Sequence, residues 1–238
     1  MTLEERIAQV KENIARAARE AGRAPAEVTL VAATKVQSSD TIRQAIAGGI
    51  TVCGENRVQE MTANLDDDAY AGAALHFIGH LQTNKVRQVV GRVDLIESVS
   101  SEHLLQAIEA QAAKLELVQD ILLEVNIGGE ASKSGVAPEA VYALAEQAMA
   151  CPHVRLRGLM AIPPIVEQPG GNRPFFAKMY QLYVDIRTKL DHNETAITCL
   201  SMGMSGDYED AVREGATHVR VGTALFGPRP PMAAQRQG

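Results

Sequence analysis

The stretch LVAATK (residues 30–35) decides the fold of this chain. Its apolar run is typical of a strand buried on both faces, and the following SSD (residues 38–40) supplies good N-cap residues for a helix. Lys35 thus ends a buried parallel strand, which is where α/β barrels place their chemistry. A desolvated lysine there can form an imine with an aldehyde. The alternative is a structural lysine whose ammonium reaches solvent at the strand end.

Working outward from this stretch, strand-like and helix-like segments alternate along the chain. The expected strands are 29–34, 50–54, 75–79, 94–99, 120–126, 156–162, 196–202 and 218–222. The expected helices are 39–48, 57–65, 82–90, 101–115, 138–150, 174–190 and 206–214, with an amphipathic N-terminal helix at 3–21. Strands that start about 27 residues apart fit a βα repeat, since parallel strands need a crossover helix.

This repeat predicts a (β/α)8 TIM barrel of the α/β class. A doubly wound open sheet is the competitor, but the chain has no glycine-rich nucleotide fingerprint. We expect one domain over 1–238, with the barrel at about 28–229. Segment 163–172 is then a long loop after the sixth strand, and 228–238 a loose tail.

Composition favours a globular cytoplasmic protein. Hydrophobic residues make up 46% of the 238 residues, and the net charge of -6 argues against nucleic acid as a partner. No apolar run is long enough to span a membrane, and the N-terminus is too charged for a signal peptide. Cys53, Cys151 and Cys199 are expected to be buried thiols in a reducing compartment. His76 and His80 flank a strand without a third ligand, so no metal is predicted.

Two loops near the end of the chain predict a phosphate site. The loop 201–205 leads into a helix with acidic residues in its first turns, so Ser205 is expected to be its N-cap. Gly222 and Thr223 follow the last strand and offer backbone N–H groups and a hydroxyl. Loops after strands 7 and 8 form the usual phosphate site of such barrels. Ordinary capping and close backbone packing are the alternative explanations.

Arg220 interrupts an apolar strand and, by alternation, faces the same side as Gly222. Its guanidinium requires an acceptor, which is either a ligand atom or a carboxylate in a structural salt bridge.

The chain also resembles the pyridoxal phosphate homeostasis protein family. The likeness covers about residues 28–229 in order. It is carried by VAATK (31–35), GENRVQE (54–60), HFIGHLQTNK (76–85), VNIGGEASKSG (125–135), RGLMAIPP (157–164) and LSMGMSGDYEDAVREGATHVRVGTALFG (200–227). That family is a single barrel similar to the N-terminal domain of alanine racemase, a fold-type III pyridoxal phosphate (PLP) protein. Arg57 departs from the family, which often has tyrosine there, and the loop 167–173 is variable.

The resemblance implies PLP as cofactor, held as an internal aldimine on Lys35. It places the phosphate near Ser205, Gly222 and Thr223. Arg220 is then at the pyridine nitrogen, and the resemblance makes Asn56 and Ser201 neighbours of the cofactor. An arginine there leaves the ring nitrogen unprotonated and weakens the ring as an electron sink.

These implications favour a PLP carrier in vitamin B6 homeostasis that has no catalytic residues of its own. We expect a monomer that passes PLP to apoenzymes. The alternatives are an amino-acid racemase or other PLP enzyme, a class I aldolase, and a protein-binding barrel. Alanine racemase uses a tyrosine from a second domain, and the chain ends too soon after the last strand for that domain. Two-base racemisation needs an acid/base on each face of the ring, and only Lys35 is evident.

Overall fold

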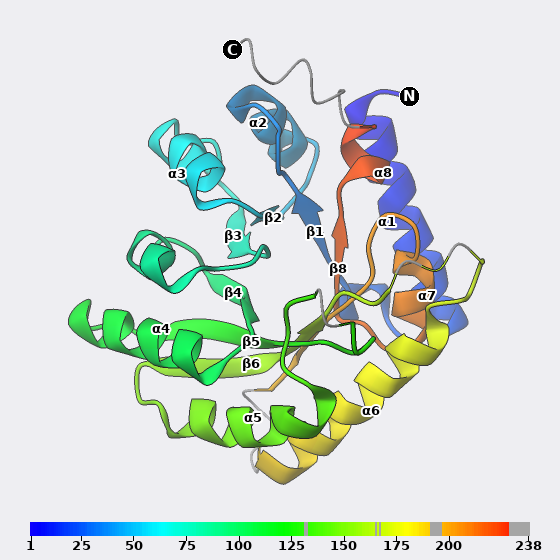
Figure 1. The fold of residues 1–238 in the computed structure, drawn as a ribbon. Coiled ribbons are helices and arrows are strands. Elements are labelled where there is room, and N and C mark those ends of the chain that lie inside the picture. Colours follow the sequence, from blue (N-terminus) through cyan, green and yellow to red (C-terminus); the bar gives the residue numbers. More distant parts are fainter. Residues whose placement is uncertain (131–132, 165, 167, 191–196, 229–238) are drawn as a thin grey trace.

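The computed structural model describes all residues except 131–132, 165, 167, 191–196 and 229–238. Eight parallel strands close into a barrel in sequence order, with β8 paired to β1 (Figure 1). They are β1 (Thr29–Ala33), β2 (Val52–Glu55), β3 (Ala74–Phe77), β4 (Leu95–Val99), β5 (Gln119–Val125), β6 (Val154–Ala161), β7 (Cys199–Ser201) and β8 (His218–Val221). The predicted (β/α)8 barrel is confirmed.

Helices surround the barrel between the strands. They are α1 (Leu3–Glu20), α2 (Ser39–Ala47), α3 (Val58–Asp66), α4 (Glu102–Lys114), α5 (Val141–Ala150), α6 (Arg173–Leu190), α7 (Tyr208–Arg213) and α8 (Thr223–Phe226). Short 3-10 turns occupy η1 (Pro25–Glu27), η2 (Thr83–Gln88) and η3 (Pro138–Ala140). The helix expected at 82–90 is therefore a 3-10 turn. Within η2 only Val86 is buried, so packing against the barrel does not impose an α-helix there.

The predicted N-terminal helix is present as α1. Thr2 and Glu5 form a capping box at its start, in which each side chain accepts from the other residue's backbone N–H. Its buried side chains, Ile7, Val10, Ile14, Ala17 and Ala18, recur at helical spacing on one face. This face packs into the same core that fills the space between barrel and helices.

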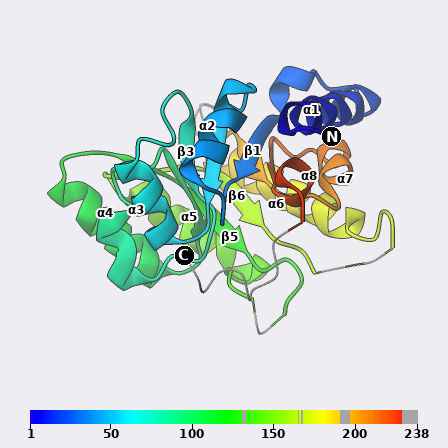
Figure 2. The same cartoon turned by 90° about the horizontal axis from the view of Figure 1, so that it is seen from above.

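Helix α1 lies beside α7 and α8, as both views show (Figures 1 and 2). The Asn13 amide donates to the Tyr208 hydroxyl of α7 at 2.9 Å. Arg6 Nε donates to the Leu225 carbonyl of α8. The N-terminal helix is thereby tied to the two elements that follow β7 and β8.

The barrel lumen holds small apolar clusters separate from the outer core. Val31, Ala33, Val52 and Ile78 form one, and Leu95, Leu122, Met160 and Cys199 form the other. Polar side chains lie in the lumen as well, since Glu97 of β4 has no exposed surface. The strands therefore contribute a buried carboxyl group as well as aliphatic side chains.

A register shift bends the sheet where β5 meets β6. Ile121 pairs with Leu156, but Leu122 pairs with Gly158, so one residue of β6 is unmatched. Gly158 has φ +146°, and a Cβ on it would lie 1.7 Å from the Cys199 carbonyl oxygen. Glycine is required here because β7 approaches the backbone so closely.

All three cysteines are free thiols, with Cys53 and Cys199 buried and Cys151 only half-buried. Among the described residues, no helix is both long enough and apolar enough to cross a membrane. Parts of three predictions lie outside the described residues: strand position 196, positions 165 and 167 of the long loop, and 229–238 of the tail.

Candidate functional site

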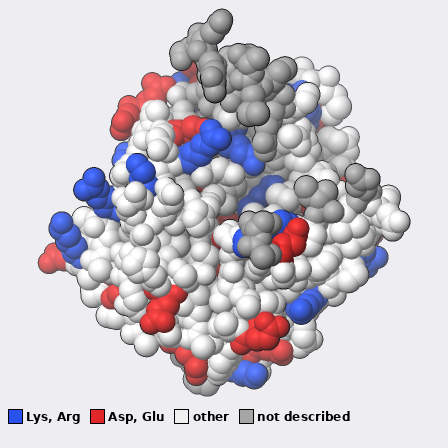
Figure 3. Space-filling view, viewed as in Figure 1, with Lys and Arg blue, Asp and Glu red and all other residues white. Residues whose placement is uncertain are grey.

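A cavity of about 240 Å³ opens at the carboxyl ends of the barrel strands. Six of the seven predicted site residues line it: Lys35, Asn56, Ser205, Arg220, Gly222 and Thr223. In the space-filling view this face is hollowed near its centre, and Lys and Arg atoms lie in and around the hollow (Figure 3). Residues that follow strands distant in sequence thus border one cavity.

Lys35 lies two residues beyond β1, in a turn that follows directly from the strand. The preceding residue, Thr34, is buried and donates its hydroxyl to Glu55 Oε1 at 2.5 Å. The Thr34 N–H also continues the pairing of β1 with β2 by donating to the Gly54 carbonyl. The residue before Lys35 is therefore fixed to the neighbouring strand, and Lys35 borders the cavity.

Arg220 is almost fully buried at the floor of the cavity. One of its terminal nitrogens donates to the Ser201 hydroxyl, and the other donates to the Ala161 carbonyl at 2.9 Å. Glu97 Oε2 lies 3.7 Å from the guanidinium. The acceptors that the sequence analysis required are thus supplied by the protein, and Arg220 also borders the cavity as predicted.

Ser201 lies beneath the cavity and has no exposed surface. Its hydroxyl donates to Glu97 Oε2 at 2.6 Å while it accepts from Arg220. Ser201 is not among the residues that border the cavity, so the structure places it behind Arg220. Its predicted closeness to a cofactor stays a prediction.

Glu97 is the centre of this buried network, and the sequence analysis did not single it out. Its Oε1 lies 2.7 Å from His76 Nδ1. Burial opposes its charge, but the hydrogen bond from His76 and the positive charge of Arg220 lower the pKa of Glu97 to about 2. A carboxylate in the apolar stretch 94–99 was the available signal, since a buried charge needs a partner.

His218 lies near His76, with ring centroids 6.0 Å apart. Burial lowers the pKa of His218 to about 4, and the positive charge of Arg220 acts in the same direction. The imidazole is therefore neutral at physiological pH. Glu97 and Arg220 form an oppositely charged pair beside this ring.

Ser205 joins the loops after β7 and β8. Its hydroxyl oxygen accepts from the backbone N–H groups of Gly222 at 3.1 Å and Ala224 at 3.3 Å. The prediction that Ser205 is the N-cap of the next helix is wrong, because Asp207 holds that position and accepts from the Met204 N–H at 2.7 Å. The Ser205 hydroxyl instead accepts hydrogen bonds from the backbone at the start of α8.

Asn56 brings an unsatisfied polar atom to the cavity. Its Oδ1 is buried and has no hydrogen-bond partner within the described part of the chain. Buried amide oxygens without partners are costly, so this atom is suited to accept from a ligand. Gly79 permits the arrangement, because a Cβ there would lie 2.1 Å from the Asn56 carbonyl oxygen.

Glu124 of β5 is a second buried carboxyl group that the sequence analysis missed. Its Oε1 accepts from the Ser134 hydroxyl at 2.7 Å, while no partner for Oε2 is found among the described residues. Burial raises the pKa of Glu124, and Arg220 and His80 oppose that shift.

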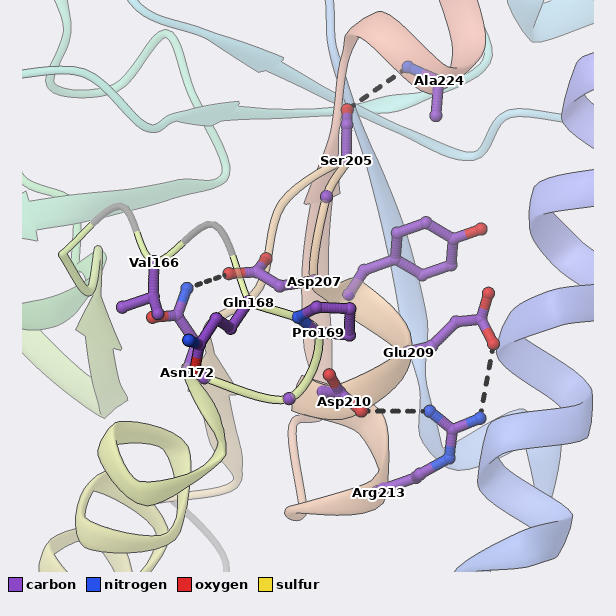
Figure 4. Close-up of a pocket in the computed structure, with 14 residues that line it drawn as sticks. Val166, Gln168, Pro169, Asn172, Ser205, Asp207, Glu209, Asp210, Arg213 and Ala224 are labelled. Carbon is purple, nitrogen blue, oxygen red and sulfur yellow. Dashed lines mark hydrogen bonds and ion pairs between the residues drawn. The ribbon is translucent and has the colours of Figure 1, made fainter.

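A second cavity of about 430 Å³ adjoins the first (Figure 4). Ser205 and Gly206 border both cavities. On its walls Asn172 donates to Asp207 at 2.7 Å, and Arg213 pairs with acidic side chains of α7. Its charged groups are largely paired with one another.

The arrangement around the first cavity combines an amine, an anion-binding turn and a cation. Ser205, Gly222 and Thr223 present hydroxyls and backbone at one end, as an anion requires. Arg220 provides a fixed hydrogen-bond donor on the floor. Such a site suits a small aromatic aldehyde that carries an anionic group.

The sequence profile of the alanine racemase N-terminal domain family matches residues 6–230. A pyridoxal phosphate homeostasis protein of Aquifex aeolicus is 43% identical over 225 residues, which cover 94% of this chain and 97% of that protein. One of Pseudomonas aeruginosa is 41% identical and covers 96% of both chains. This chain belongs to the pyridoxal phosphate homeostasis protein family.

Solved structures agree with this membership in the pyridoxal phosphate homeostasis protein family. PipY of Synechococcus elongatus PCC7942, in its structure with PLP bound, superposes with a TM-score of 0.82 at 32% identity, covering 95% of this chain and all of that chain. Alanine racemase of Clostridium difficile 630 superposes with a TM-score of 0.74 at 15% identity, and 57% of its chain is covered. The latter similarity shows the fold alone.

Proposed function

We propose that this chain binds pyridoxal 5'-phosphate and acts in PLP homeostasis. The observation that carries the proposal is the convergence of Lys35 with Ser205, Gly222, Thr223 and Arg220 on one cavity. Relatives named pyridoxal phosphate homeostasis protein, and PipY with PLP bound, support the same ligand.

The chemistry of the cavity fits this cofactor. PLP would supply an aldehyde carbon, and Lys35 is the residue whose amine would hold the cofactor there covalently, with release of one water. Ser205 and Thr223 would hold the phosphate with their hydroxyls at the turn that contains Gly222. The unsatisfied Oδ1 of Asn56 offers an acceptor on the cavity wall.

Arg220 would face the pyridine nitrogen and donate to it. Burial lowers the pKa of Arg220, and the negative charge of Glu97 opposes this shift, so the guanidinium keeps its proton. A donor that does not surrender its proton leaves the ring nitrogen neutral and makes the ring a poor electron sink. This favours storage and delivery of the cofactor over catalysis such as transamination.

The proposed role is that of a cytoplasmic carrier without turnover of its own. We also propose that the chain is one PLP-binding barrel domain, acts as a monomer and transfers PLP to apoenzymes. Among the described residues, no group of three or more His, Cys, Asp or Glu side chains could hold a metal ion.

Reduction and peptide mapping test the proposal directly. The protein is saturated with PLP, reduced with borohydride and digested, and we expect the pyridoxyl group on Lys35. The variant Lys35→Ala should lose both the label and the absorbance of the covalent complex. Labelling mainly of Lys85 or Lys133, or no labelling at saturation, would overturn the assignment.

A further inference from the structure

The backbone is strained at the residue that follows Lys35. Val36 has φ +58°, in the left-handed region. The other described non-glycine residues with positive φ are Asp68 and Glu116, which are not β-branched. For a β-branched residue this conformation is unfavourable and persists only where the surroundings enforce it.

The carboxylate of Glu60 is the group that engages this residue. Its Oε2 accepts from the Val36 N–H at 3.0 Å, across 24 positions of sequence. Its other oxygen, Oε1, accepts from Arg57 at 3.0 Å. Glu60 is in α3, so its place is set by a helix that packs on the barrel.

The other side of Lys35 is held independently. Thr34 is bound through its hydroxyl to Glu55 Oε1, which also accepts from Tyr70 at 2.9 Å. The Gln37 N–H donates to the Thr34 carbonyl and closes the turn at 3.0 Å. Lys35 therefore lies between a residue anchored in the sheet and a residue held in an unfavourable conformation.

We propose that Glu60 is a positioning residue for Lys35. By accepting from the Val36 N–H, it holds the left-handed turn that keeps the amine of Lys35 at the cavity. Without this acceptor Val36 relaxes to its preferred backbone region, and the direction of the Lys35 side chain changes with it. The inference rests on the proposed function, because it concerns the covalent step at Lys35.

The test compares two ligands that differ in one functional group. PLP has the aldehyde that reacts with Lys35, whereas pyridoxine 5'-phosphate has an alcohol and binds only non-covalently. In Glu60→Ala we expect the affinity for PLP to fall about tenfold, the effect of losing a charge-assisted hydrogen bond. The affinity for pyridoxine 5'-phosphate should change less than about twofold, since Glu60 does not border the cavity.

Three further variants separate positioning from charge and from folding. Glu60→Gln keeps an acceptor for the Val36 N–H and should stay within about twofold of the unmodified protein. Arg57→Ala leaves Glu60 Oε2 on Val36 and should behave likewise. Combining Val36→Gly with Glu60→Ala should restore most of the lost PLP affinity, because glycine adopts positive φ without strain.

Equal loss of both ligands in Glu60→Ala would overturn the inference, since it would indicate a collapsed cavity. An unchanged PLP affinity in that variant, or a loss as large in Glu60→Gln, would overturn it too. Failure of the proposed function is recognised separately, because then the unmodified protein itself does not bind PLP covalently.

Discussion

At the scale of single residues, the site depends on side chains that bind other parts of the protein and also border the cavity. Ser205 accepts two backbone N–H groups with its lone pairs and still has its own hydroxyl hydrogen to donate. Arg220 is held by Ser201 and Ala161 while it borders the cavity. Residues of this kind shape the cavity before any ligand enters it.

Loss of both hydroxyls at the phosphate end should discriminate between two forms of the vitamin. Ser205→Ala combined with Thr223→Ala should weaken PLP far more than pyridoxal, because each charge-assisted donor contributes roughly 1.5–3 kcal/mol. Titration of the absorbance with each aldehyde measures the two affinities. Equal weakening of both aldehydes would place the phosphate elsewhere.

Acid should destabilise the protein through its buried titratable groups. The pKa of His218 is about 4 when folded and 6.5 ordinarily, so unfolding takes up a proton between these values and stability falls as the pH falls. At about 1.4 kcal/mol per unit, the loss is about 3 kcal/mol by pH 4. Glu97, whose pKa is lowered from 4.5 to about 2, adds a loss of the same sign as the pH falls from about 4.5 to about 2.

Urea unfolding at pH 7 and pH 4 measures this effect. The variant His218→Gln should lose less stability over the same interval than the unmodified protein, since it no longer binds that proton. An identical pH dependence in the two proteins would contradict the assignment to His218.

At the scale of elements, the bulge in β6 connects the fold to the site. The register shift at Gly158 precedes Ala161, whose carbonyl accepts from Arg220. Without the extra residue the end of β6 would shift by one position relative to β5, and alternate side chains would exchange faces. The bulge therefore helps to place the acceptor that holds Arg220.

Gly158→Ala should be strongly destabilising. The added Cβ would overlap the Cys199 carbonyl oxygen, so β6 and β7 could not keep their present pairing. We expect a loss of at least 3 kcal/mol in the free energy of unfolding, comparable to severe packing defects. Gly206→Ala is the control, since no atom lies within 4 Å of its added Cβ, and it should unfold nearly like the unmodified protein.

The sequence predicted the regular elements better than the contacts between them. Strands such as β1 were predictable because apolar runs and strand spacing follow from local chemistry. The bulge at Gly158 and the role of Ser205 were not, because both depend on a neighbouring strand or loop distant in sequence. Glu97 was missed for the same reason, since its partners come from three other strands.

At the scale of the whole molecule, two-base racemisation would need a second acid or base beside the cavity. Among the described residues that border it, Lys35 is the one with a basic amine, and none is a tyrosine. Tyr70 is buried against Glu55, and Tyr208 is bound to Asn13 of α1. His80 borders a different cavity, which is lined by residues that follow β3 and β4.

We therefore expect no appreciable racemisation of alanine or other common amino acids by the PLP-saturated protein. Reprotonation on the face opposite Lys35 needs a group within about 3 Å of the reacting carbon. Chiral chromatography of long incubations measures the rate, with Lys35→Ala as the background. Robust turnover that disappears in His80→Ala would identify a racemase instead of a carrier.

The attachment of α1 to α7 and α8 has a thermodynamic consequence. Arg6 and Asn13 connect this outer helix to the elements that follow β7 and β8, and Ser205 accepts from the first turn of α8. The same contacts break when α8 unfolds locally and when α1 unfolds locally. A ligand that makes local unfolding of α8 less frequent must therefore also make local unfolding of α1 less frequent. Amide hydrogens of α1 should therefore exchange more slowly when the mouth of the barrel is filled.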